Sequence, residues 1–125
     1  SMVVALRDVV EDAMQRVTLY PGDKVLDIGC NDGTMLSFYP SYVNCYGYEP
    51  AWNLWEEAKK KSRGCIYPAY FPRNAVAGDK YKIISSIAQF YNVDDPNAYV
   101  AAIKKQLTPD GIWIVQFQDV DLMLH

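Results

Sequence analysis

The sequence predicts one α/β domain built around a buried, parallel sheet. Short apolar runs without the alternation of a half-exposed strand recur along the chain, and segments of helical periodicity lie between them. A glycine-containing loop also follows the first apolar run, where open parallel sheets bind ligands. With 125 residues, of which 50% are hydrophobic, residues 1–125 are sufficient for a single core.

The expected elements alternate along the whole chain. Apolar residues at helical spacing predict an amphipathic helix over 3–17, and a turn at 20–23 leads to a fully apolar, buried strand at 25–28. Asp95 followed by Pro96 predicts the cap and first residue of another helix. The remaining expected segments are a short helix within 33–39, a strand at 43–48, a helix at 52–62, strands at 65–67 and 81–86, a turn at 108–111 and a strand at 112–117.

Charge, cysteine usage and hydropathy exclude several classes of function. The net charge of −3 and the pI near 5.0 give no basic surface for a phosphate backbone, so nucleic acid is not an expected partner. The sequence shows no membrane span or secretory signal, and its three widely spaced cysteines suit reduced thiols, so we expect a soluble, cytoplasmic protein. The only histidine is the terminal His125, which argues against a zinc site or a histidine-based triad.

The loop after the first strand is the first candidate binding site. It reads Asp27-Ile28-Gly29-Cys30-Asn31-Asp32-Gly33, a DxGxxxG spacing in which Gly29 permits a tight exit and Gly33 lets a helix start close to a ligand. Asn31 stands where a GxGxxG dinucleotide site has its second glycine, which disfavours a nicotinamide-dependent oxidoreductase. A purely structural turn explains this loop alone equally well.

A second acidic residue favours a ligand site over a structural turn. Glu49 closes the second predicted strand 20 residues beyond Gly29. At that offset a carboxylate accepts hydrogen bonds from both hydroxyls of a ribose. The competing interpretation of Glu49 is a solvated loop acid.

Three segments together resemble the class I S-adenosylmethionine-dependent methyltransferases. The stretch 25–36 is similar to the first motif of that superfamily, 47–50 to its second motif, and 107–113 to the turn ahead of its fifth strand. The Asn-Asp-Gly-Thr loop, Glu-Pro followed by Asn53, and the Pro-Asp-Gly turn most resemble the C-methyltransferases of nucleotide-linked deoxysugars. The resemblance implies a Rossmann-like parallel sheet of about five strands in the order 3-2-1-4-5, with helices on both faces and without the last strands of the full fold.

The resemblance also implies S-adenosyl-L-methionine as cofactor and assigns residues to it. Glu49 would hold the ribose, while four residues of the first loop would surround the methionine end: Asp27, Gly29, Cys30 and Asn31. The further cofactor-binding candidates are Gly33, Pro50, Ala51, Asn53, Tyr70, Phe71, Ser86 and Gln89. The sequence assigns no metal ligands and no catalytic base.

These observations lead to three functional expectations. We expect a methyltransferase domain for a small-molecule acceptor, with a nucleotide-linked sugar as the narrower class; the alternative is a module that binds S-adenosylmethionine without turnover. We expect the chain to be part of a longer protein and, because it offers no evident base, not to methylate a carbon acceptor alone. We also expect an edge strand at 112–117 that self-associates or is covered by the tail at 118–125.

Overall fold

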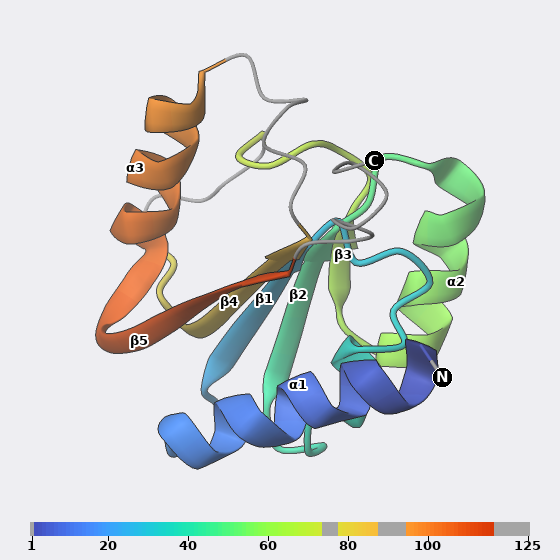
Figure 1. Ribbon diagram of the computed structural model, residues 1–125. Helices are drawn as coiled ribbons and strands as arrows, with labels where there is room; N and C mark the ends of the chain where they lie inside the picture. Colours follow the sequence, from blue (N-terminus) through green and yellow to red (C-terminus); the bar gives the residue numbers. More distant parts are fainter. Residues whose placement is uncertain (1, 74–77, 88–94, 117–125) are drawn as a thin grey trace, which may run out of the picture.

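The computed structural model describes residues 2–73, 78–87 and 95–116 (Figure 1). Its elements are, in chain order, α1 (Met2–Arg16), β1 (Lys24–Ile28), the 3-10 helix η1 (Leu36–Phe38), β2 (Asn44–Tyr48), α2 (Trp52–Ser62), β3 (Cys65–Tyr67), β4 (Tyr81–Ile87), α3 (Pro96–Gln106) and β5 (Leu107–Gln116). The strands form one sheet in the order β3-β2-β1-β4-β5, and all four neighbouring pairs are parallel. The expected fold class and strand order are confirmed.

Helices pack against both faces of the sheet. On one face, Val10 and Ala13 of α1 and Ala58 of α2 form a core with buried residues of the central strands. On the other face, Ile103 of α3 packs with Leu26 and other residues of a second core. Successive strand residues face opposite sides. The described helices include none that is both long and apolar enough to cross a membrane.

Two segments differ from the sequence-based expectation. The helix expected within 33–39 is a single 3-10 turn at Leu36–Phe38, because Asp32 accepts the Thr34 N–H and holds the preceding residues in a loop. The fifth strand begins at Leu107 rather than at residue 112. Leu107 already pairs with Tyr81, and the expected turn forms a register irregularity inside the strand. The predicted end of this strand, Phe117, lies outside the described residues.

Candidate functional site

The carboxyl ends of β1 and β2 bring the first loop beside the start of α2. Both the Gly29 and Cys30 N–H groups donate to the carbonyl oxygen of Tyr48, at 2.9 and 3.0 Å. Gly29, Asn31 and Gly33 all have left-handed backbone conformations, with φ of 73°, 53° and 83°. The loop therefore turns sharply over the end of β2, which places it next to Glu49.

Glu49 connects this loop to the start of α2. Its side chain is buried, and its Oε1 accepts the Asn31 N–H at 3.0 Å while its Oε2 accepts the Ala51 N–H at 2.9 Å. Each carboxylate oxygen has more than one acceptor position. The two amides thus fix the orientation of the carboxylate and leave acceptor capacity for a ligand's hydroxyl groups.

Asp27 is a second buried carboxyl at the same edge of the sheet. It is 3% exposed, and its Oδ1 accepts the Ser85 hydroxyl at 2.8 Å. The pKa of Asp27 is raised to about 7: burial is the largest cause, the Ser85 hydrogen bond partly opposes it, and the nearby Glu49 carboxyl adds a smaller upward effect. Near neutral pH, Asp27 is therefore only partly ionised.

The two loop glycines have different surroundings. A Cβ atom added to Gly29 would meet no atom of the described residues within 4 Å, so with respect to these residues the backbone at the end of β1 borders open space. A Cβ atom on Gly33 would lie 2.9 Å from the Cα atom of Ala58 in α2. The structure thus explains Gly33 by helix packing rather than by the close approach of a ligand. Contact between Gly33 and the cofactor stays a prediction.

Cys30 packs the loop onto β2. Its side chain is buried, and a Cβ atom on Gly47 would lie 2.8 Å from the Cys30 sulfur. Burial, and secondarily the nearby carboxyls of Asp27 and Glu49, raise the pKa of the Cys30 thiol above its ordinary value. The thiol is therefore protonated at neutral pH, which removes it as a nucleophile.

Three other candidates lie beside Glu49. Ala51 is the N-cap residue of α2, and the exposed side chains of Pro50 and Asn53 flank it. Tyr70 follows β3, the strand next to β2, and is 72% exposed. These four positions border Glu49 or the end of the neighbouring strand, and their contact with the cofactor stays a prediction.

Of the remaining candidates, two are buried and one lies outside the described residues. Phe71 is buried, with its ring centroid 5.3 Å from that of Tyr48. Ser86 is also buried, and its hydroxyl accepts the Trp113 indole N–H at 3.0 Å. Both side chains are buried, and contact of either with the cofactor stays a prediction. Gln89 lies outside the described residues.

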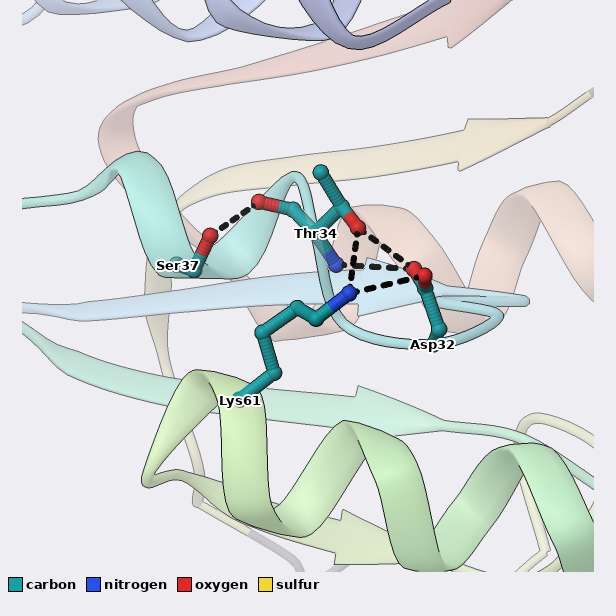
Figure 2. A network of polar contacts seen from close by, with 4 residues as sticks. All are labelled: Asp32, Thr34, Ser37 and Lys61. Carbon is teal, nitrogen blue, oxygen red and sulfur yellow. Dashed lines mark hydrogen bonds and ion pairs between the residues drawn. The ribbon is translucent and has the colours of Figure 1, made fainter.

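A polar network that the sequence did not indicate holds the far half of the loop. Figure 2 shows Lys61, in the last turn of α2, reaching Asp32 Oδ2 at 2.9 Å and the Thr34 hydroxyl at 3.2 Å. Asp32 Oδ1 accepts both the N–H and the hydroxyl of Thr34. No periodicity relates Lys61 to a loop 29 residues away.

The arrangement suits a nucleoside with free hydroxyl groups better than a pyrophosphate. Buried carboxyls accept hydroxyl or ammonium donors, whereas they repel phosphate oxygens. Within the described ranges, no cluster of three or more histidine, cysteine or acidic residues could hold a metal ion. Fold and site together define an open parallel α/β protein whose two buried carboxyls, at the carboxyl ends of β1 and β2, have the chemistry to accept the hydroxyls of a nucleoside-type ligand.

Comparison with known proteins agrees with this class. The sequence model of a methyltransferase domain family matches residues 4–125. A protein of Schizosaccharomyces pombe named an uncharacterized methyltransferase is 27% identical over 109 residues, covering 71% of this chain and 37% of that protein. The chain therefore belongs to the S-adenosylmethionine-dependent methyltransferases of class I.

Solved structures show the same fold at lower sequence identity. The plantazolicin methyltransferase BpumL, in complex with a monoazolic desmethylPZN analog and SAH, has a TM-score of 0.78 at 14% identity, covering 96% of this chain and 48% of that chain. DesVI of Streptomyces venezuelae has a TM-score of 0.70 at 19% identity, covering 90% of this chain and 49% of that chain. This chain thus spans about half or less of each of these relatives.

Proposed function

We propose that residues 1–125 are the cofactor-binding domain of a longer methyltransferase, with S-adenosylmethionine bound across the loop at 29–33. The observation that carries this proposal is the buried Glu49 carboxylate, which two backbone amides hold in place at the end of β2. A carboxylate in fixed orientation accepts two ribose hydroxyls without further reorganisation. The open space beside Gly29 is where the backbone permits close approach of the ligand.

The residues present fit this cofactor by their chemistry. Glu49 would hold the ribose hydroxyls, Asp27 and the loop backbone would border the methionine portion, and Tyr70 would lie on the adenine side. S-adenosylmethionine supplies an activated methyl group, so methyl transfer requires binding and alignment of both partners. In this proposal, the described residues of this chain bind the cofactor.

A small molecule is the acceptor class that we propose. Two relatives of the same fold support it, because BpumL is described with a desmethylPZN analog and coclaurine N-methyltransferase with N-methylheliamine. The narrower proposal is a nucleotide-linked sugar, which rests on the motifs at 31–34 and 49–50. Cys30, Cys45 and Cys65 are all free thiols, which supports a cytoplasmic location.

Calorimetry with four ligands tests the proposed cofactor site. The chain should bind S-adenosylmethionine and S-adenosylhomocysteine but not NAD. Glu49→Gln should weaken S-adenosylhomocysteine binding about tenfold or more, because it replaces one carboxylate acceptor by an amide donor. Glu56→Gln, a matched change at an exposed position of α2, should bind like the wild type.

An altered ligand separates ribose recognition from loop stability. The fourth ligand, S-adenosylhomocysteine without the ribose 2′-hydroxyl, should bind the wild type more weakly than its parent. It should lose little further affinity in Glu49→Gln, because the contact is then already absent. Equal affinity of the wild type for both ligands would place the ribose elsewhere.

A further inference from the structure

Helix α2 contacts the first loop at three levels along its length. At its start, Glu49 joins the Ala51 N–H to the Asn31 N–H. In its middle, the backbone of Ala58 lies directly under Gly33. In its last turn, Lys61 reaches across to Asp32. The position of the loop relative to β1 and β2 therefore depends on α2 as well as on the sheet.

The contact at the end of α2 is a connected network of three side chains. Both oxygens of Asp32 are used: Oδ1 accepts from Thr34, and Oδ2 accepts from Lys61 (Figure 2). Burial alone would raise the pKa of Asp32, but the hydrogen bonds from Thr34 and Lys61 outweigh it and hold that pKa below its usual value. Asp32 therefore stays ionised and paired at neutral pH.

The residues on either side of Asp32 explain why the loop needs this network. Asn31 and Gly33 both have positive φ, so the backbone on each side of Asp32 lies in the left-handed region. A non-glycine residue at positive φ costs free energy and persists only where its surroundings fix it. The Glu49 carboxylate fixes the backbone at Asn31 by accepting its N–H, and the Lys61 ammonium fixes the Asp32 side chain.

We propose that Lys61 is a positioning residue for cofactor binding. By holding Asp32 and Thr34 against α2, it keeps the Gly29–Asn31 half of the loop in the conformation that receives the ligand. This inference rests on the proposed function, since it assigns Lys61 a role at that same site. Lys61 does not contact the cofactor; it acts through Asp32.

If Lys61 had a purely structural role, its loss would change the free energy of unfolding rather than the affinity for the cofactor. The side chains of Lys61 and Asp32 are 41% and 42% exposed, and ion pairs at this exposure contribute little to the free energy of unfolding. Loss of a preorganised loop, in contrast, appears directly in the dissociation constant, because the ligand must then order the loop on binding. Affinity and stability therefore separate the two roles.

The test compares Lys61→Met, Lys61→Arg and Lys60→Met in the otherwise unchanged chain. Lys60 is the matched control, because it is exposed in the same turn and forms no ion pair with any described residue. Lys61→Met should weaken S-adenosylhomocysteine binding about fivefold. Lys61→Arg should restore most of the affinity, Lys60→Met should bind like the wild type, and all three should melt within a few degrees of it.

A double-mutant cycle and a salt series complete the experiment. Asp32→Asn should weaken binding by a similar factor, and adding Lys61→Met to it should cause little further loss. High salt should reduce the difference in S-adenosylhomocysteine affinity between the wild type and Lys61→Met, because salt screens the ion pair. Equal affinity of Lys61→Met and Lys60→Met for S-adenosylhomocysteine would overturn the inference, whereas a wild type that binds no S-adenosylhomocysteine would overturn the proposed function and this inference with it.

Discussion

Asp27 and Glu49 are both buried at the carboxyl ends of neighbouring strands, yet their surroundings differ. Each Glu49 oxygen receives a backbone N–H, whereas Asp27 receives the Ser85 hydroxyl. Two backbone amides hold the Glu49 carboxylate in one orientation, whereas a single hydroxyl offsets only part of the cost of burying Asp27. Glu49 is therefore suited to accept a ligand's hydroxyl groups in a fixed geometry. The charge of Asp27, in contrast, depends on pH near neutrality.

The raised pKa of Asp27 predicts a specific pH dependence of stability. Its folded pKa of about 7 exceeds the ordinary 3.8, so the folded chain binds the proton more tightly than the unfolded chain. The contribution of Asp27 is therefore complete below pH 3.8 and is lost as pH rises to about 7. Relative to Asp27→Asn, the wild type should lose on the order of 3 kcal/mol of unfolding free energy across this window.

Urea denaturation between pH 4.5 and 8.5 measures this difference. Asp27→Asn retains an oxygen that accepts from Ser85, so the substitution removes the titration with little change in packing. Asp8→Asn, on the exposed side of α1, is the control and should follow the wild-type profile. Parallel profiles for Asp27→Asn and wild type would mean that Asp27 titrates as it does in the unfolded chain.

At the scale of secondary-structure elements, the loop glycines predict two distinct phenotypes. Gly33→Ala should destabilise the chain by about 3 kcal/mol, because it adds strain at positive φ and a clash with the Ala58 backbone. Gly29→Ala should cost only about 1 kcal/mol, from φ strain alone. It should nevertheless weaken S-adenosylhomocysteine binding, because the new methyl group fills space assigned to the ligand.

Thermal melts and calorimetry on both glycine variants distinguish these effects. We expect the loss of S-adenosylhomocysteine affinity, relative to the loss of unfolding free energy, to be larger for Gly29→Ala than for Gly33→Ala. The reverse order would indicate that the cofactor lies closer to Gly33 than to Gly29.

The parts of the structure that the sequence predicted are those set by local chemistry and strand order. Asp95 caps α3 by accepting the Ala98 N–H, as its pairing with Pro96 indicated. The proximity of Glu49 to the first loop followed from spacing, because parallel β1 and β2 end side by side with Ile28 opposite Tyr48. Such features depend on few residues and on the general rules of parallel sheets.

The parts that could not be predicted depend on how elements pack. The contact between Lys61 and Asp32, and that between Gly33 and Ala58, exist only once α2 lies across the loop. The turn predicted at 108–111 gave the wrong strand start, because pairing with β4 extends β5 back to Leu107 through an irregular register. The sequence shows which residues favour a turn, but it does not show which neighbouring strand pairs with them.

At the scale of the whole molecule, we predict cofactor binding without turnover of a carbon acceptor. Burial is the main cause that raises the pKa values of Tyr48 and Tyr67 to about 12, so neither phenol is a base at neutral pH. In the proposed function, Asp27 and Glu49 border the cofactor and are not offered as the base for an acceptor. Incubation with labelled S-adenosylmethionine and nucleotide-linked keto-deoxysugars should give no multiple-turnover transfer; robust transfer would identify a base that this account misses.

The edge of the sheet leads to a prediction about association. Within the described residues β5 pairs only with β4, so its other edge carries backbone groups without a strand partner. We propose that this edge mediates self-association of the 125-residue chain or is covered by the tail at 118–125. A monomer at high concentration by light scattering, together with rapid amide exchange throughout β5, would contradict both alternatives.

The central claim is that S-adenosylmethionine binds across the first loop with its ribose on Glu49. Titration of the ¹⁵N-labelled chain with S-adenosylhomocysteine, followed by amide chemical shifts, tests it most directly. The largest changes should occur at Asn31 and Ala51, whose N–H groups donate to the Glu49 carboxylate, and at Gly29 beside the open space. Unchanged Asn31 and Ala51 signals with the largest shifts at the opposite end of the sheet, near Thr108 and Asp110, would contradict the account.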